Sequence, residues 1–292
     1  MSTSVQPQLI NDPDAAFRAV RDGQAAGRRV GVVMTMGALH QGHLSLVKQC
    51  RDECDLTFVT IFVNPTQFLP GEDFQQYPRQ LQEDIALLQT VGVDVVFAPS
   101  TETMYPDGAS TMVRPPLVSQ SLEGNHRPGH YEGVCTIVCK LFQILPVDRA
   151  YFGSKDYQQY LVIKQMAADL NIPVQVVACP IIRDADGLAL SSRNRYLSSE
   201  ERARALSLSR GLREAADEVA AGQLNAKVLI ERIRFEMTEA GVEKIDYVAI
   251  ADPETLAPIE TLEGPVIALI AAHVGGTRLI DNRPLHPMNH KP

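Results

Sequence analysis

Through the first two thirds of the chain, short apolar runs alternate with segments whose apolar residues recur every three or four positions. This alternation is typical of parallel βαβ units and predicts a doubly wound parallel sheet. The run LTFVTIFV has no polar alternation, so we expect a strand buried on both faces, and the same holds for the last strand. The expected strands are 29–34, 56–63, 93–98, 150–152 and 174–178, and the expected helices are 13–27, 43–54, 78–91, 134–145 and 157–170.

The pattern changes after residue 183. Residues 198–221 form a long charged amphipathic segment, opened by a serine with two glutamates in the first turn, as at a capped helix start. A second helix is expected at 226–240, followed by strands at 245–250 and 266–274. Helices followed by strands predict a smaller α+β domain. We therefore expect one domain at 1–183 and another at 184–292.

Residues 99–129 are polar and rich in proline and glycine. An irregular connection of this length is uncommon inside a compact domain unless it has a function. We therefore expect it to border a ligand site.

The composition is that of a globular protein, with 45% hydrophobic and 21% charged residues, which excludes a disordered or fibrous chain. The 292 residues carry a formal net charge of −8. Such a chain has no overall field to attract nucleic acid or an anionic membrane, so we expect neither as a partner.

The cysteines and the first residues bear on the compartment. The 5 cysteines show neither a C-x-x-C motif nor zinc-site spacing, so we expect buried, reduced thiols. The opening segment MSTSVQPQLI lacks a basic region followed by an apolar core, and the longest apolar runs are too short to span a membrane. We expect a cytoplasmic protein.

The most informative segment for chemistry is 34–47, MTMGALHQGHLSLV, in which a strand end is followed by a glycine turn and a helix. Ligands of open α/β sheets bind beyond the carboxyl ends of the strands, where helix N-termini offer N–H groups to anions. Gly37 and Gly42 allow close backbone approach, and His40 and His43 can donate hydrogen bonds to phosphoryl oxygens. A lone histidine here would more simply cap or pack, but two in one glycine-flanked turn favour a phosphate site.

Two common nucleotide motifs do not fit this segment. Its glycines have the spacing of a P-loop, but His43 and Leu44 stand where Lys and Ser or Thr are needed. No G-x-G-x-x-G follows the first expected strand either. The sequence disfavours a P-loop kinase and a dinucleotide-dependent dehydrogenase.

Two further segments carry groups suited to a nucleotide. In 152–160, FGSKDYQQY, Lys155 suits phosphate, Asp156 can accept from ribose hydroxyls, and Gln159 can both donate and accept. The segment 182–195, IRDADGLALSSRNR, has hydroxyls and arginines that can close over a triphosphate. Taken alone, the first could be a surface helix start and the second a solvated linker. Three such segments together favour nucleotide chemistry.

Several segments, spaced in order over nearly the whole chain, resemble the pantoate–β-alanine ligases of the nucleotidyltransferase superfamily, which share a His-x-Gly-His signature. The matching segments are 35–43 TMGALHQGH, 61–68 IFVNPTQF, 77–79 YPR, 127–134 RPGHYEGV, 152–159 FGSKDYQQ and 191–194 SSRN.

The resemblance implies a Rossmann-like domain for nucleotide and pantoate, a smaller lid domain, a homodimer, and Mg²⁺ bound with ATP. It also implies two half-reactions on the route to coenzyme A. Pantoate attacks the α-phosphate of ATP to give pantoyl adenylate and pyrophosphate, and β-alanine then displaces AMP to give pantothenate. We expect no protein ligand for the metal, because Glu83 and Asp84 fit a solvated helix face better.

The resemblance also implies the site residues. Catalysis is assigned to His40, His43, Lys155 and Arg193, and pantoate or β-alanine binding to Gln67 and Gln159. His43 is the position usually described as a proton donor, although a carboxylate nucleophile has no proton to lose. ATP contacts are assigned to Met36, Gly37, Ala38, Leu39, His40, Gln41, Gly42, His43, Gly153, Ser154, Lys155, Asp156, Ile182, Leu190, Ser191, Ser192 and Arg193.

The sequence departs from the family pattern at three positions. Met34 replaces a common proline, Ser154 a frequent Glu or Gln, and Leu190 a usual methionine. None of these changes removes a charged or hydrogen-bonding group assigned to chemistry, so we expect them to affect rates more than the reaction.

Two other functions remain open. The chain could be a nucleotidyltransferase that joins a nucleotide to a phosphorylated acceptor, but Asn64, Thr66 and Gln67 offer neutral groups rather than a cationic pocket. It could instead be a nucleotide-binding regulator without turnover. The intact histidines, Lys155 and Arg193 argue against that interpretation.

Overall fold

The computed structural model describes residues 6–287, which pack as two compact units. The first contains the residues up to Ser154 together with Gln158–Pro180, and the second contains Lys155–Tyr157 and the residues from Ile181 onward. Lys155–Tyr157 thus pack apart from the chain segments on either side of them. The first five residues of the opening segment discussed above lie outside the described range.

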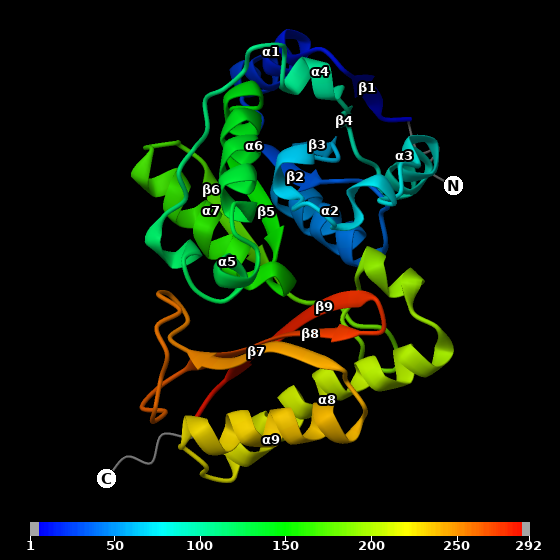
Figure 1. Cartoon of the computed structure of the whole chain (residues 1–292). Helices are drawn as coiled ribbons and strands as arrows, with labels where there is room; N and C mark the ends of the chain where they lie inside the picture. Colours follow the sequence, from blue (N-terminus) through cyan, green and yellow to red (C-terminus); the bar gives the residue numbers. More distant parts are fainter. Residues whose placement is uncertain (1–5, 288–292) are drawn as a thin grey trace. The chain divides into compact units, whose positions relative to one another are not determined.

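The first unit is built on a six-stranded parallel sheet within the described residues, which confirms the expected doubly wound fold (Figure 1). The strand order is β1-β4-β3-β2-β5-β6, so the order reverses between β2 and β5. Ligands of such sheets bind at this switch point, beyond the carboxyl ends of the strands. The strands are β1 Gln8–Ile10, β2 Val30–Thr35, β3 Leu56–Ile61, β4 Val95–Phe97, β5 Arg149–Gly153 and β6 Gln175–Cys179.

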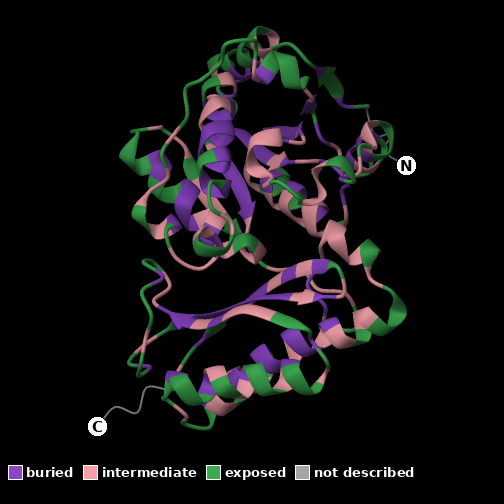
Figure 2. Ribbon diagram, in the orientation of Figure 1, coloured by how far each residue is buried: buried purple, intermediate pink, exposed green. Residues whose placement is uncertain are grey.

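Helices cover both faces of this sheet. One apolar cluster joins α1, α6 and α7 to the sheet, and a second joins α2 and α3 to the opposite face. Figure 2 shows buried residues concentrated in the central strands and in α6. The helices are α1 Pro13–Ala25, α2 Gln41–Glu53, α3 Leu81–Thr90, α4 Thr101–Met104, α5 Glu123–His126, α6 His130–Ile144 and α7 Tyr157–Asp169, with 3₁₀ turns η1 Pro65–Gln67, η2 Asp73–Gln75, η3 Leu117–Ser119 and η4 Ser154–Asp156.

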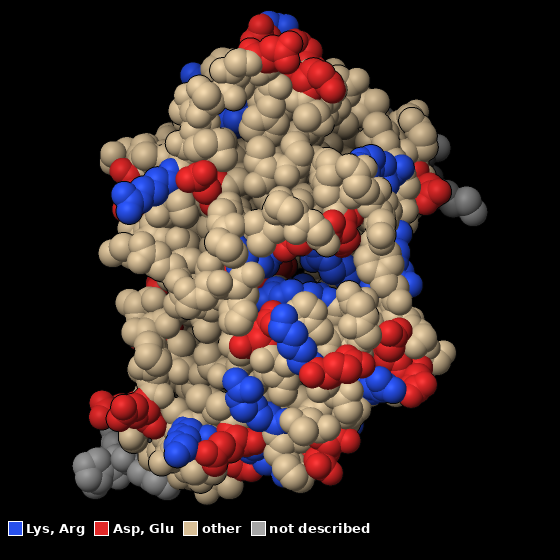
Figure 3. Space-filling model, in the orientation of Figure 1, with Lys and Arg blue, Asp and Glu red and all other residues tan. Residues whose placement is uncertain are grey.

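The second unit is a small α+β structure, as expected. Its described strands pair antiparallel in the order β7-β8-β9, and the two long helices share an apolar cluster with this sheet. On the face shown in Figure 3, acidic and basic side chains are interspersed over these helices. The elements are η5 Ser192–Tyr196, α8 Ser199–Ala220, α9 Ala226–Glu239, β7 Lys244–Ala251, β8 Val266–Val274 and β9 Thr277–Leu285.

Several elements differ from the sequence expectation. Strands β1 and β9 were not expected, because β1 is three residues long and β9 carries charges at Arg278, Asp281 and Arg283. Strand β6 was expected to be buried, but it lies at the edge of the sheet and is largely exposed or half-buried. Helix α6 begins four residues earlier than expected, after Gly129, whose φ of 89° suits glycine.

The described cysteines are free thiols. Cys50, Cys135 and Cys179 are buried, whereas Cys54 and Cys139 are half-buried. None of the described helices is both long and apolar enough to span a bilayer.

Candidate active site

The turn after β2 has an unusual backbone. Gly37 and Ala38 both have positive φ values, 80° and 51°, a conformation that is easy for glycine and uncommon for alanine. The turn is fastened at its start by Thr35, whose hydroxyl donates to the carbonyl of Thr60 and accepts from the peptide N–H of Gly37. The adjacent strand β3 therefore helps to hold this turn.

Asp84 of α3 holds the same turn from the other side. Its carboxylate oxygens accept the peptide N–H groups of Ala38 at 3.0 Å and Leu39 at 2.9 Å. A Cβ atom at position 37 would come within 2.8 Å of this carboxylate, so the close approach requires glycine. The side chain is 0% exposed, and burial raises the pKa of Asp84. The expectation of a solvated face is therefore wrong for Asp84, although Glu83 is exposed.

The two histidines cap helix α2. His40 is the N-cap residue, and its Nδ1 accepts the peptide N–H of Gly42 at 3.1 Å. His43 lies in the first turn, and its Nδ1 accepts the peptide N–H of His40 at 3.3 Å. Because each Nδ1 acts as an acceptor, a neutral ring carries its hydrogen on Nε2. Both rings, with centroids 4.1 Å apart, therefore present an N–H donor at a helix N-terminus.

Gln67 lies in the loop after β3, and its amide is oriented by two neighbours. Its Oε1 accepts from Nδ2 of Asn64 at 3.1 Å, and its Nε2 contacts Sδ of Met36 at 3.0 Å. Asn64 is 1% exposed and also accepts from the hydroxyl of Tyr105 at 2.8 Å. The structure thus brings the expected substrate-binding amide against the expected ATP turn.

The backbone of Gln67 is braced by a buried cluster. Nδ1 of His130 lies 2.8 Å from the carbonyl oxygen of Gln67, so this nitrogen is the donor. Burial, followed by the charge of Arg127, lowers the pKa of His130 to about 4, so the ring is neutral and Nε2 accepts from Arg127 at 3.0 Å. Arg127 also pairs with Glu72. Tyr105 and Arg127 belong to the 99–129 stretch, which therefore contacts the Gln67 loop.

The first unit places several expected residues at one edge of its sheet. The turns after β2, β3 and β5 all leave the carboxyl ends of adjacent parallel strands. Gly153 ends β5, where an added Cβ atom would lie 4.0 Å from Leu46 of α2, and Ser154 follows it. Gln159 is half-buried in α7. These positions surround the reversal of strand order between β2 and β5.

The remaining expected residues lie in the second unit. Segment 182–190 folds back on itself, with the peptide N–H of Leu190 donating to the carbonyl of Ile182 at 2.9 Å. Ser191 then caps η5 by accepting the peptide N–H of Arg193 at 3.3 Å. This segment is therefore ordered rather than a solvated linker.

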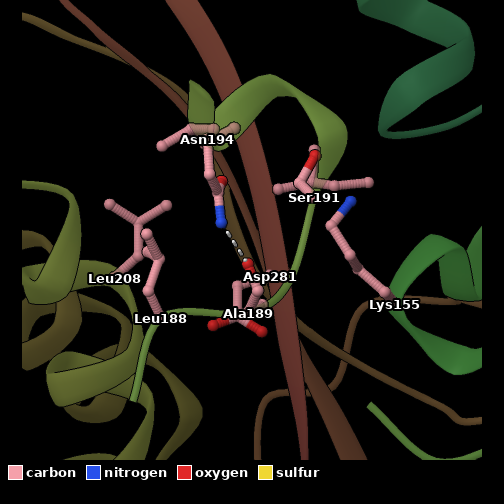
Figure 4. A pocket seen from close by; sticks show the side chains of 9 residues that line it. Lys155, Leu188, Ala189, Ser191, Asn194, Leu208 and Asp281 are labelled. Atoms are coloured by element: carbon pink, nitrogen blue, oxygen red, sulfur yellow. Dashed lines mark hydrogen bonds between the residues drawn. The ribbon is translucent and has the colours of Figure 1, made fainter. Parts of the chain in front are cut away.

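Lys155 lines a small hollow of the second unit. Figure 4 shows its side chain extending toward Ser191, with Asn194 and Asp281 also at the wall. Nζ of Lys155 is 3.8 Å from a carboxylate oxygen of Asp156, which is half-exposed. Cationic and hydroxyl groups thus share this hollow. Among residues 6–287, no cluster of three or more His, Cys, Asp or Glu side chains forms a metal site.

The family is decided by comparison with known proteins. The family model described as pantoate-beta-alanine ligase matches residues 8–284. The chain belongs to this family.

Individual relatives agree with the family match. The chain is 52% identical to the pantothenate synthetase of Acidobacterium capsulatum, over 94% of this chain and 95% of that protein. The crystal structure of pantothenate synthetase from Thermus thermophilus has a TM-score of 0.91 and 41% identity, covering 96% of this chain and all of that one. The crystal structure of pantoate-beta-alanine ligase from Francisella tularensis, described as complexed with beta-gamma ATP and β-alanine, has a TM-score of 0.78 and 37% identity, covering 95% of this chain and 97% of that one.

Within this pantoate–β-alanine ligase, some supporting residues escaped the sequence analysis. These are Asp84, Tyr105 and His130, each of which is distant in sequence from the group that it holds. The sequence therefore gave only a weak sign of their supporting role. A carboxylate inside an otherwise apolar helix face was the available sign for Asp84, since α3 buries Asp84 beside Ile85 and Leu88. For His130, the sign was its place in the segment RPGHYEGV.

Asp84→Asn tests the support of the turn. An amide can accept at one position but presents an N–H at the other, so one peptide donor of the turn loses its partner. We expect the free energy of unfolding to fall by about 1–3 kcal/mol. We also expect kcat/KM for ATP to fall about tenfold, corresponding to about 1.4 kcal/mol of lost binding.

The control is Glu83→Gln, which neutralises the exposed neighbouring carboxylate. Both variants are compared by denaturant unfolding and by initial rates at varied ATP. Equal behaviour of the two variants would show that Asp84 does not support the turn.

Proposed function

We propose that the chain condenses pantoate with β-alanine, converting ATP to AMP and pyrophosphate through a pantoyl adenylate. The observation that carries this proposal is the family match over residues 8–284. The acid must be activated first, because a carboxylate is inert toward amines. Adenylation activates it, since AMP is a good leaving group. A site that holds the adenylate also protects it from water and aligns the amine.

In this proposal the histidine turn binds the ATP phosphates. The Nε2–H groups of His40 and His43 would donate to phosphoryl oxygens as negative charge develops at the α-phosphate. Neither histidine needs to transfer a proton, because the nucleophile is a carboxylate. The peptide groups of 36–42 would approach the phosphates closely, as the glycines permit.

Lys155 and Arg193 would neutralise the triphosphate and the leaving pyrophosphate. Lys acts as a compact point charge, and Arg offers a planar fork matched to phosphate oxygens. We propose the further ATP contacts at Gly153, Ser154, Asp156, Ile182 and 190–192, with Ile182 offering backbone groups to adenine. Gln67 and Gln159 would bind the hydroxyls and carboxylate of pantoate.

We propose that Mg²⁺ enters with ATP, whose phosphate oxygens are ligands of the kind that this ion prefers. Bound there, Mg²⁺ would reduce the negative charge that the nucleophile must approach. Asp84 does not fit as a protein ligand for Mg²⁺, because its carboxylate oxygens already accept the peptide N–H groups of Ala38 and Leu39.

Three further properties belong to the proposal. We infer a homodimer, a cytoplasmic location, and a nucleotide- and pantoate-binding domain at 1–183 with a lid at 184–292. These rest on the resemblance to the family. Light scattering of the purified protein would test the dimer.

The decisive experiment follows labelled pyrophosphate into ATP in the presence of Mg²⁺. Exchange that depends on pantoate, followed by AMP release on addition of β-alanine, would establish both half-reactions. Exchange that requires a phosphorylated acceptor instead would identify another nucleotidyltransferase. ATP binding without exchange under any of these conditions would identify a regulator.

Gln67→Ala should weaken pantoate binding more than ATP binding. The substitution removes an amide that Asn64 and Met36 orient, so about 1–1.4 kcal/mol of binding is lost, and KM for pantoate should rise about tenfold. The matched control is Gln165→Ala, at an exposed position of α7. Initial rates at varied pantoate and varied ATP separate the two effects, and an unchanged KM for pantoate would remove Gln67 from the binding site.

A further inference from the structure

Lys155 is packed with the second unit although the chain on either side of it belongs to the first. Ser154 and Gln158 pack with the parallel sheet, whereas Lys155–Tyr157 pack with the residues that follow Ile181. A three-residue segment stays in such a place only if specific contacts hold it there. Those contacts are made at both ends of the segment.

One contact holds the main chain of Lys155 itself. Nδ2 of Asn282, in β9, donates to the carbonyl oxygen of Lys155 at 2.9 Å. Asn282 is 3% exposed, so this hydrogen bond is shielded from water. At the other end of the segment, the hydroxyl of Tyr157 donates to the carbonyl oxygen of Pro253 at 2.9 Å.

Asn282 is itself held rigidly. Its peptide N–H donates to Oδ1 of Asp281 at 2.8 Å, and its position in β9 is paired with Leu269 of β8. Asp281 accepts two hydrogen bonds from the guanidinium of Arg183, at 2.7 and 2.9 Å. The Asp281 side chain is 2% exposed, so this bidentate pair is fixed within the unit.

These contacts fix the main chain of Lys155, from which its side chain extends. Lysine has a flexible four-carbon side chain, so the position of its ammonium group depends on a fixed main chain. From this anchored carbonyl, the side chain reaches the hollow lined by Ser191 and Asn194 (Figure 4). The Ser191–Arg193 segment and Lys155 therefore belong to the same compact unit.

We propose that Asn282 is a positioning residue for Lys155, acting through the Lys155 carbonyl to place the ammonium group for adenylate formation. This inference rests on the proposed function, because it assumes that Lys155 acts on the ATP phosphates. Asn282 touches no reacting atom in this role. Loss of the Asn282 amide therefore lowers the rate of adenylate formation only to the extent that it displaces Lys155.

The test is Asn282→Asp, which keeps the size of the side chain but removes the N–H donor and turns an acceptor toward the Lys155 carbonyl. We expect pantoate-dependent pyrophosphate exchange to fall about 10- to 100-fold, the scale for displacing a catalytic group. The matched control is Ser207→Ala. Ser207 is 0% exposed in the same unit and donates to the carbonyl of Arg204, without contact to Lys155. This control is expected to retain the wild-type exchange rate.

A double-mutant cycle with Lys155→Ala separates positioning from general stability. If Asn282 acts through Lys155, adding Asn282→Asp to Lys155→Ala leaves the residual exchange rate within about twofold. An equal loss in both backgrounds would mean that Asn282 merely maintains the fold, and would overturn the proposal. A high enzyme concentration and a long incubation keep slow exchange measurable.

A second variant covers failure of Asn282→Asp to fold. Tyr157→Phe removes the hydroxyl that anchors the other end of the segment, and we expect a several-fold loss of exchange that also disappears in the Lys155→Ala background. If Asn282→Asp does not fold, Asn282→Ala removes the same donor, and wild-type exchange by Asn282→Ala overturns the proposal. Absence of exchange in the wild-type protein would instead refute the proposed function, so the two failures are distinguishable.

Discussion

His43→Ala is expected to lower the rate of adenylate formation by roughly 10²-fold or more, the scale for losing one transition-state hydrogen-bond donor. The imidazole accepts the peptide N–H of His40 through Nδ1, which places the ring hydrogen on Nε2. Replacing His43 with alanine removes both the Nδ1 acceptor and the Nε2–H donor. The rate is measured as pantoate-dependent exchange of pyrophosphate, and the fold is checked by circular dichroism.

Two amide substitutions separate the roles of the ring nitrogens at position 43. Asparagine can accept the peptide N–H of His40 but lacks a donor at the position of Nε2. We therefore expect His43→Asn to form the adenylate as slowly as His43→Ala. Glutamine can place an amide N–H near the position of Nε2, so we expect partial recovery of the rate. Because an amide cannot transfer a proton at neutral pH, recovery by Gln would exclude an essential proton transfer.

The control for this series is His126→Ala, since His126 is exposed at the end of α5. We expect it to retain the wild-type rate. Wild-type exchange in His43→Ala would remove the histidine turn from the chemistry, whatever the family resemblance implies.

Lys155→Ala is expected to lower adenylate formation by a similar factor, roughly 10²-fold or more. The loss arises because an ammonium group that faces the triphosphate stabilises charge as pyrophosphate departs. Lys155→Arg keeps the charge but replaces a compact ammonium with a larger planar fork, so we expect only partial activity. Both variants should bind pantoate with little change, because the charge acts on the nucleotide.

The control is Lys227→Ala, which removes a lysine of the same unit whose side chain is 84% exposed. Exchange rates at saturating ATP compare the three variants directly. If Lys155→Ala and Lys227→Ala gave the same rate as the wild type, Lys155 would have no role in catalysis and the positioning role of Asn282 would have no basis.

The contacts around Gln67 predict that a substitution outside the substrate site can have the same effect as one within it. Asn64 and His130 hold the side chain and the carbonyl of Gln67, and a Cβ atom at Gly133 would lie 2.1 Å from the carbonyl oxygen of Thr66. Helix α6 therefore packs against the backbone of this loop. The sequence indicated Gln67 through its motif, but not the helix that positions it.

Local patterns account for most of the correct predictions from sequence. The uninterrupted apolar run of β3 indicated a central strand, and Ser198 with the first-turn glutamates marked the start of α8. The His-containing turn was recognisable because its glycines, histidines and following helix are adjacent in the chain. Boundaries were less accurate: α2 begins at Gln41 rather than His43, because His40 supplies the cap.

By itself, the sequence of this protein determined the βαβ order, the α+β character of the later part of the chain and the motifs of its family, since each depends on residues close together in the chain. The tertiary structure alone decided which distant groups support those motifs. Asp84 accepts a hydrogen bond from Ala38, which lies 46 residues away in the sequence. Asn282 donates to the carbonyl of Lys155, which lies 127 residues away. Strand β9 likewise becomes a strand because β8 supplies its hydrogen bonds. Such contacts depend on the folded chain bringing remote backbone donors and acceptors together, which no local periodicity records.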